Sequence, residues 1–247
     1  MTRGWRDLGL RAEQWLVAKG WRAQKSYSQC GEDLMIRFLF DIIGVDRPSY
    51  IDLGAHHPSY LSNTRKLYSE GCRGINVEAN PALMARFLRH RSGDLNLNVG
   101  IVTEHRDGQW VDFHVMNDPA MSTFSAEEAQ RLEAETSMRV VKRIPVAVRG
   151  LSSLIEEYCG GVFPDLLSVD IEGTDALVLP VLARTELERR PKVVCIETLS
   201  YSESGTASKR VDLIDGIVRT GYEMYADTYI NTIFKRSDLG HRYASRG

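Results

Sequence analysis

Residues 50–58 read Tyr-Ile-Asp-Leu-Gly-Ala-His-His-Pro, and this stretch decides the fold of the chain. The short apolar run of residues 49–53 around Asp52 predicts a buried strand. Gly54 follows, where a tight turn toward a helix favours a residue without a side chain. Because open α/β sheets bind ligands beyond the carboxyl ends of their strands, this turn is a candidate ligand site, with Asp52 placed to accept hydrogen bonds from an ammonium group. An ordinary strand-to-helix turn is the alternative, since the loop holds only one glycine.

Strand-like and helix-like segments alternate on both sides of this turn. Upstream, a helix is expected from Glu32 to Ile43, ended by Gly44. The other expected strands are 73–77, 96–102, 166–170, 193–197, 222–226 and 229–234, and the other expected helices are 60–70, 81–90, 151–158, 175–183 and 208–219. This alternation predicts a mostly parallel sheet with helices on both faces. Since only Asp227 and Thr228 separate the last two strands, we predict a seven-stranded, Rossmann-like α/β fold that ends in an antiparallel hairpin.

Two regions lie outside this pattern. Residues 110–115 and 140–148 are extended runs around a polar stretch, which predicts an insertion of antiparallel strands over about 105–150, with residues 121–124 in a lid. Residues 5–18 have roughly helical apolar spacing and are expected to pack on the domain, a membrane-surface or partner-binding helix being the alternative. We therefore divide the chain into an N-terminal helical extension or cap, 1–45, and a main domain, 46–240.

The composition is that of an ordinary globular protein. Of the 247 residues, 43% are apolar and 26% are charged, and the net charge of −2 gives no reason to expect a nucleic-acid partner. No stretch approaches the roughly 20 apolar residues of a membrane span, and the N-terminus lacks the pattern of a secretory signal. The four cysteines form no CxxC pair. We expect a cytoplasmic protein without integral membrane association, and its oligomeric state is left open.

Glu78 ends the second expected strand, 24 residues after Gly54. An acid at about this distance is where a ribose-binding carboxylate belongs, because its two oxygens match the two ribose hydroxyls. The alternative is an acid favoured by the positive end of the following helix. Asn80 is expected to cap that helix, which Pro81 opens.

Acidic residues also follow two later strands. Asp170 ends one strand, Glu172 and Asp175 come directly after it, and Glu197 ends the next. We expect Asp170 to face a cofactor or substrate, whereas Asp175 is expected to be a helix N-cap. Glu197 is either a catalytic or hydroxyl-binding residue or the partner of a neighbouring arginine. These four acids offer hard oxygen ligands for magnesium, but their spacing does not demand a metal, and no metal site is assigned.

Five segments together resemble the FkbM family of methyltransferases: SQCGEDLMI (28–36), YIDLGAHHPSYLSNT (50–64), GINVEANP (74–81), LNLNVGI (95–101) and LLSVDIEGTDALVL (166–179). The resemblance runs over roughly residues 26–235. It implies a class I methyltransferase fold, S-adenosylmethionine as methyl donor, and O-methylation of sugars and other natural-product hydroxyls. It also implies that Ser28, Gln29 and Gly31 help to cover the cofactor pocket. The expected cofactor-binding residues are Gln29, Gly31, Asp52, Gly54, Ala55, His56, Glu78, Ala79, Asn98 and Asp170.

An alcohol loses its proton as it attacks a methyl donor, so a general base is expected within hydrogen-bond reach. Asp170 is the first candidate, followed by Glu172, Glu197 and His57, although a histidine in this turn could equally position the cofactor or cap the helix. The expected partner is a small-molecule or glycan acceptor. Two alternatives stay open at this point. One is a non-catalytic cofactor-binding scaffold, and the other is an NAD-dependent oxidoreductase, which predicts a fuller glycine loop and no terminal hairpin.

Overall fold

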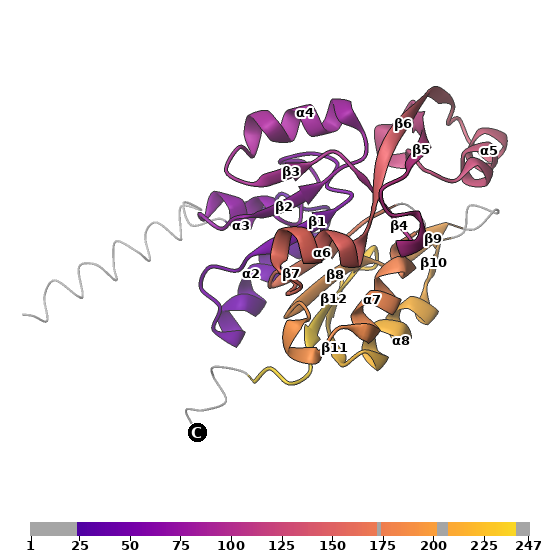
Figure 1. Cartoon of the computed structure of the whole chain (residues 1–247). Coiled ribbons are helices and arrows are strands. Elements are labelled where there is room, and N and C mark those ends of the chain that lie inside the picture. Colours follow the sequence, from indigo (N-terminus) through magenta and orange to yellow (C-terminus); the bar gives the residue numbers. More distant parts are fainter. Residues whose placement is uncertain (1–23, 172–173, 202–206, 241–247) are drawn as a thin grey trace, which may run out of the picture.

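The computed structural model describes residues 24–171, 174–201 and 207–240. Its centre is a seven-stranded sheet in the order β11-β12-β8-β7-β1-β2-β3 (Figure 1). The strands are β1 (Tyr50–Leu53), β2 (Gly74–Val77), β3 (Leu95–Leu97), β7 (Leu166–Val169), β8 (Val193–Glu197), β11 (Tyr222–Asp227) and β12 (Asn231–Arg236). β12 runs antiparallel to both β8 and β11, while the other neighbours are parallel. The predicted mostly parallel, Rossmann-like sheet with a terminal antiparallel hairpin is confirmed. The predicted helix at 5–18 lies outside the described residues.

Helices cover both faces because successive strand residues point to opposite sides. Ile51, Leu53 and Val169 belong to one apolar core, which packs against α6 (Leu151–Cys159), α7 (Val178–Arg184) and α8 (Val211–Arg219). Tyr50 and Leu166 belong to the opposite core, with α2 (Glu32–Ile43) and α3 (Arg65–Ser69). α4 (Pro81–His90) packs through Met84 and Phe87 against Ala55. α2 thus packs on the same sheet as the rest of the chain, and the division at residue 45 stays a prediction.

The ends of α2 and α4 follow the predicted signals. Gly44 closes α2 in the left-handed conformation, with φ of 78°. Asn80 caps α4 by accepting a hydrogen bond from the Ala82 N–H, and Pro81 is the first helical residue. The helix predicted at 60–70 is shorter than expected, because Leu61 has a φ of 53° and the Ser62 N–H is bonded outside any helix to the Tyr27 carbonyl.

The single strand predicted at 96–102 is wrong. The chain forms β3 and then β4 (Gly100–Val102), and these belong to different sheets. Between them, the Asn98 side chain donates to the carbonyls of Glu78 and Ala79, at 2.8 and 3.0 Å. This contact fastens the loop to the end of β2 as the chain leaves the main sheet.

β4 joins a second sheet, in the order β4-β6-β5. β5 (Trp110–Met116) and β6 (Val140–Gly150) are antiparallel, which confirms the predicted antiparallel strands of the insertion, and α5 (Ala126–Glu135) lies between them in sequence. Figure 1 shows this unit at one side of the main sheet, far from α2. The remaining elements are β9 (Leu199–Tyr201), β10 (Ala207–Lys209) and the 3-10 helices η1 (Glu104–Arg106), η2 (Pro119–Met121), η3 (Asp175–Leu177) and η4 (Leu187–Arg189). None of the described helices combines the length and apolarity needed to cross a bilayer.

Candidate active site

Four predicted residues follow or end neighbouring parallel strands: Gly54 after β1, Glu78 after β2, Asp170 after β7 and Glu197 at the end of β8. The sheet therefore brings them to one edge, the carboxyl edge, where α/β folds bind ligands.

Gly54 is required by the protein's own backbone. Its φ is 75°, and a Cβ at this position would lie 1.7 Å from the Asp170 carbonyl oxygen. The Gly54 and Ala55 N–H groups both donate to the Val77 carbonyl, and the Asp170 N–H donates to the Leu53 carbonyl. These backbone hydrogen bonds connect the ends of β1, β2 and β7 at the turn. Sequence reasoning attributed the glycine to a turn and a nearby ligand, and it did not foresee this contact.

Glu78 is buried beside the turn. One carboxylate oxygen accepts from the His56 N–H at 2.9 Å, and the other accepts from the Asn80 N–H at 2.7 Å. Burial raises the pKa of Glu78, and the two backbone hydrogen bonds oppose that rise. Each oxygen keeps capacity for a further hydrogen bond, so the carboxylate can also receive the hydroxyls of a diol.

The two histidines of the turn differ. His56 has a φ of 53°, and burial lowers its pKa while the Asp118 carboxylate opposes that effect. Asp118 caps η2 of the inserted unit, so this unit reaches toward the turn. His57 accepts from the Ser59 and Tyr60 N–H groups through Nδ1, at 3.2 and 3.0 Å. Through Nδ1 the His57 ring thus caps its own turn, and the predicted catalytic role of this residue stays a prediction.

Asp52 lies inside β1 rather than at the open edge. It is buried, and it accepts a hydrogen bond from the Thr64 hydroxyl at 2.7 Å. Burial raises its pKa, against hydrogen bonds from Thr64 and Ser168 and the charge of Arg91. Its carboxyl thus already accepts a hydrogen bond from within the protein, and the predicted role as acceptor for an ammonium group stays a prediction.

Arg91 organises the buried network around Asp52. Its side chain is fully buried, and Nε pairs with Asp94 at 2.9 Å. One Nη donates to the Tyr50 and Thr64 hydroxyls, and the other donates to the Pro58 carbonyl. Arg91 therefore ties the loop after His57 to the sheet. The sequence offered no signal for this role, because three of these partners, Tyr50, Pro58 and Thr64, are distant along the chain.

The segment before α2 is held over the same edge. Glu32 is buried and accepts from Thr228 and Asn231, at the turn between β11 and β12. Although burial raises its pKa, these hydrogen bonds and the Cys30 N–H lower it overall. Asp33 accepts from the Ser26 and Ser28 hydroxyls. Sequence reasoning missed both acids, although acidic residues in the first turn of a predicted helix were a signal.

Gln29 and Gly31 lie in this same segment. Gln29 is exposed, and Gly31 stands before α2 with a φ of 91°. A Cβ at Gly31 would meet nothing within 4 Å, so its backbone faces open space. The placement is compatible with a covering role for this segment.

Asp170 and Glu197 are a pair of neighbouring, interacting carboxyls at the ends of β7 and β8. Asp170 is exposed, whereas Glu197 is only partly so. Burial, reinforced by the charge of Asp175, raises the pKa of Glu197 to about 7, against the hydrogen bond from Asp170 and the charge of Arg210. A carboxyl with a pKa near 7 is partly protonated and partly ionised at neutral pH, so Glu197 can take up or release a proton there.

Asp175 has a different role from the predicted N-cap. It is buried, and its two oxygens accept from the Ile171 N–H at 2.9 Å and from Arg210 at 3.2 Å. η3 has Thr174 at its N-cap position. Glu172 lies outside the described residues. Among the described residues, no three histidine, cysteine or acidic side chains are grouped as a metal site would require.

The predicted lid residues 121–124 belong to the inserted unit. Thr123 and His114 exchange backbone hydrogen bonds at 2.9 and 3.2 Å, and Phe124 stacks on Phe113 with ring centroids 4.7 Å apart. Phe124 also lies over Gly100, where a Cβ would be 2.2 Å from the ring. The segment therefore packs onto the small sheet, and an acceptor-binding role stays a prediction.

The sequence matches the profile of the methyltransferase FkbM domain over residues 52–224, more than half of the chain. The chain belongs to the FkbM methyltransferase family. This confirms the resemblance seen in the sequence, and it favours a methyltransferase over the NAD-dependent oxidoreductase. No curated protein matches the sequence.

Two solved structures are similar to this FkbM methyltransferase. One is a TehB-like SAM-dependent methyltransferase from Corynebacterium glutamicum, with 12% identity, a TM-score of 0.40, and coverage of 92% of this chain and 97% of that one. The other is PH1948 from Pyrococcus horikoshii, a provisionally assigned RNA methyltransferase, with 11% identity, a TM-score of 0.38, and coverage of 84% and 82%.

Proposed function

We propose that this FkbM methyltransferase methylates a hydroxyl oxygen of a sugar or of a glycosylated small molecule or glycan. The observation that supports this most directly is the Asp170–Glu197 pair at the carboxyl edge, with the pKa of Glu197 raised to about 7. A hydroxyl is a weak nucleophile until its proton is removed, and a base works best when its pKa is near the working pH. An amine that is neutral when bound would not need such a group.

The site residues suit the methyl donor that the family uses. Glu78 retains acceptor capacity for the ribose hydroxyls, and the backbone of Gly54, Ala55 and His56 lies beside it. Asn98 fixes the backbone of Glu78 and Ala79, which supports that position. When bound, S-adenosylmethionine supplies an electrophilic methyl group on a positively charged sulfur.

In this proposal Asp170 is the group that touches the acceptor. It is exposed at the end of β7, so it can accept the hydroxyl proton. Glu197 interacts with it, and its charge state changes how readily Asp170 takes up that proton. The alignment of acceptor and donor by the surrounding loops lowers the barrier further, because the two reactants are held in a productive geometry.

The test is a methyl-transfer assay with labelled S-adenosylmethionine and a panel of free sugars, glycosides and matched amino sugars. We expect label on oxygen, located by NMR of the product, and its loss in Asp170→Asn with cofactor affinity retained in calorimetry. Label on nitrogen only would overturn the hydroxyl assignment. Cofactor binding without transfer to any acceptor would support the non-catalytic scaffold instead. Parallel assays with EDTA and with added Mg²⁺ test for a metal requirement.

A further inference from the structure

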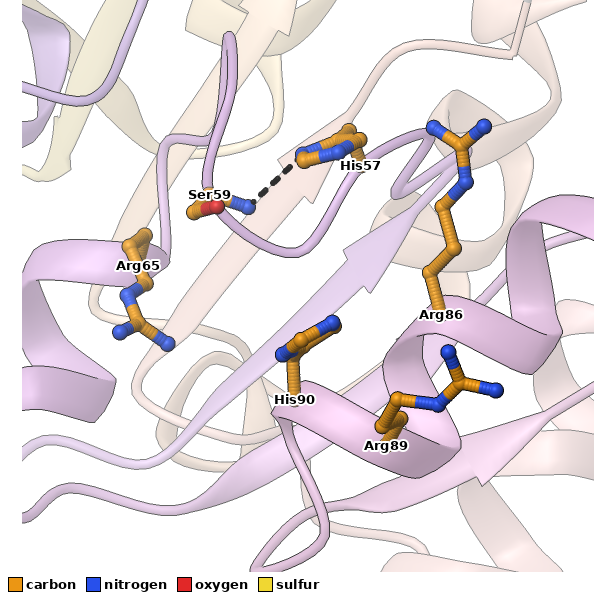
Figure 2. A pocket seen from close by; sticks show the side chains of 6 residues that line it. All are labelled: His57, Ser59, Arg65, Arg86, Arg89 and His90. Carbon is orange, nitrogen blue, oxygen red and sulfur yellow. Dashed lines mark hydrogen bonds between the residues drawn. The ribbon is translucent and has the colours of Figure 1, made fainter.

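A pocket of about 390 Å³ adjoins the candidate site on the side of α3 and α4. It is lined by His57, Ser59, Arg65, Arg86, Arg89 and His90 (Figure 2). Arg86, Arg89 and His90 come from one stretch of α4, Arg65 begins α3, and His57 and Ser59 belong to the loop after β1. Of the described residues, none that lines the pocket is acidic. On a chain whose net charge is −2, this concentration of basic groups is local and not a general property of the surface.

Within the part of the chain that the structure describes, no acidic side chain pairs with Arg65, Arg86 or Arg89, the arginines of this pocket. Arg91, immediately after α4, is instead paired with Asp94 and fully buried. Like charges three or four residues apart on a helix destabilise it. The arginines of the pocket therefore repel one another, which destabilises α4, and a bound anion would offset this repulsion.

The surroundings of Arg65 also favour a bound anion. Its Nε is buried and has no hydrogen-bond partner, which is unfavourable for a charged donor. Its guanidinium lies 5.8 Å from the centroid of the Tyr27 ring and 5.5 Å from that of Tyr68, and these rings limit its orientation. The two rings therefore hold the Arg65 guanidinium in place, while its Nε–H makes no hydrogen bond.

His57 adds a directed donor. Because its Nδ1 accepts from the Ser59 and Tyr60 N–H groups, the ring proton is placed on Nε2. Burial lowers the pKa of His57, and the positive charge of Arg86 lowers it further. In Figure 2, Arg65 lies on one side of the pocket and Arg86 and Arg89 lie on the other, with His57 and Ser59 between them.

We propose that this pocket binds a phosphate-class oxyanion, either a phosphoryl or a diphosphoryl group. Planar guanidinium groups bind phosphate oxygens through paired N–H donors, and the histidine and serine add neutral donors. The volume is at the lower end of the range of small-molecule sites, and it has room for a diphosphoryl group. The site is distinct from the methyl-transfer residues and does not depend on the identity of the acceptor.

The test is calorimetry of the full chain in a low-salt, phosphate-free buffer. The probes are inorganic phosphate, inorganic pyrophosphate and a nucleoside diphosphate. We expect pyrophosphate to bind with one-to-one stoichiometry, and the double variant Arg86→Gln/Arg89→Gln to weaken it about tenfold or more. Tighter binding of the nucleoside diphosphate would identify a phosphoryl group carried by a larger molecule, and equal binding would identify a free oxyanion.

The matched control is Arg184→Gln/Arg219→Gln, which removes the same charge from exposed positions on α7 and α8. Arg86 and Arg89 are also exposed, so circular dichroism and the melting temperature are expected to stay unchanged in both variants. Equal weakening of binding in the two variants would show a general charge effect and overturn the proposal. Absence of binding by all three probes to the wild-type protein would overturn it as well.

Discussion

Asp52 and Asp170 lie on neighbouring parallel strands, yet the protein uses their carboxyls in opposite ways. Asp52 is inside β1, buried, and bonded to Thr64 within the network of Arg91. Asp170 follows β7, is exposed, and interacts with Glu197. Asp52 pairs with Ser168, so a shift of two residues along the strand direction separates an acid that supports the fold from one that can meet a substrate. Substitutions at the two positions and around them test this division.

Asp170→Asn is expected to have the largest effect. The amide cannot accept the hydroxyl proton, so kcat should fall by about 10²- to 10⁴-fold, the range for loss of a general base. The dissociation constant of S-adenosylmethionine should change little. Single-turnover kinetics and calorimetry measure the two quantities separately. An equal loss in both would mean that Asp170 serves cofactor binding and not proton transfer.

Gly54→Ala tests the contact that places Asp170. The added Cβ would meet the Asp170 carbonyl oxygen at 1.7 Å, in a backbone conformation with φ of 75°. We expect a loss of several kcal/mol, on the order of 3, in the free energy of unfolding. Urea denaturation measures it, and Gly31→Ala, where a Cβ meets nothing, is the control for positive φ alone. If Gly54→Ala and Gly31→Ala lost the same free energy of unfolding, the contact with the Asp170 carbonyl would not explain the loss at Gly54.

Glu78→Ala should weaken cofactor binding, and it also removes the acceptor of the His56 and Asn80 N–H groups. Loss of hydrogen bonds to a charged group costs about 1–3 kcal/mol, so the dissociation constant of S-adenosylmethionine should rise by roughly 5- to 150-fold. Glu78→Gln keeps the acceptor oxygen and should lose less. Titration calorimetry checks both variants. Unchanged affinity in Glu78→Ala would exclude the ribose-binding role.

Much of the fold could be predicted from the sequence, because local signals determine it. Asn80 and Pro81 predicted the start of α4, and Gly44 predicted the end of α2. The short connection after Asp227 predicted the terminal hairpin. The turn at Asn98 was missed because its partners are carbonyls of Glu78 and Ala79, which become neighbours only when β2 is in place.

The candidate site could be predicted only in part, for the same physical reason. The pattern of acids after strands pointed to Glu78, Asp170 and Glu197, which the sheet does bring to one edge. It could not separate Asp52 from them, because the burial of Asp52 depends on Thr64 and on Arg91. Long-range partners determine which carboxyl is available to a ligand.

Glu197→Gln tests the pH dependence of the pair. With the pKa of Glu197 at about 7, the wild-type pair loses a proton near that pH and becomes a better proton acceptor. Wild-type kcat/KM should therefore rise through pH 7, while the glutamine variant should show no such step between about pH 6 and 8. A step that persists in the variant would assign the titration to another group.

Asp52→Asn is expected to have the smallest effect of these substitutions. The effect is on the free energy of unfolding, and whether the variant is more or less stable than the wild type depends on pH. Burial raises the pKa of Asp52 above its ordinary value of 3.8, so the folded protein holds the proton more tightly than the unfolded chain. Wild-type stability is then lost as the pH rises above about 4, whereas a neutral amide avoids that loss. The variant should match or exceed the wild type at pH 8, within about 1 kcal/mol, and lose any advantage near pH 4. Denaturation curves of the variant and the wild type at pH 8 and pH 4 measure this difference in stability. If Asp52→Asn lowered kcat as much as Asp170→Asn, the two aspartates would not differ in function as proposed.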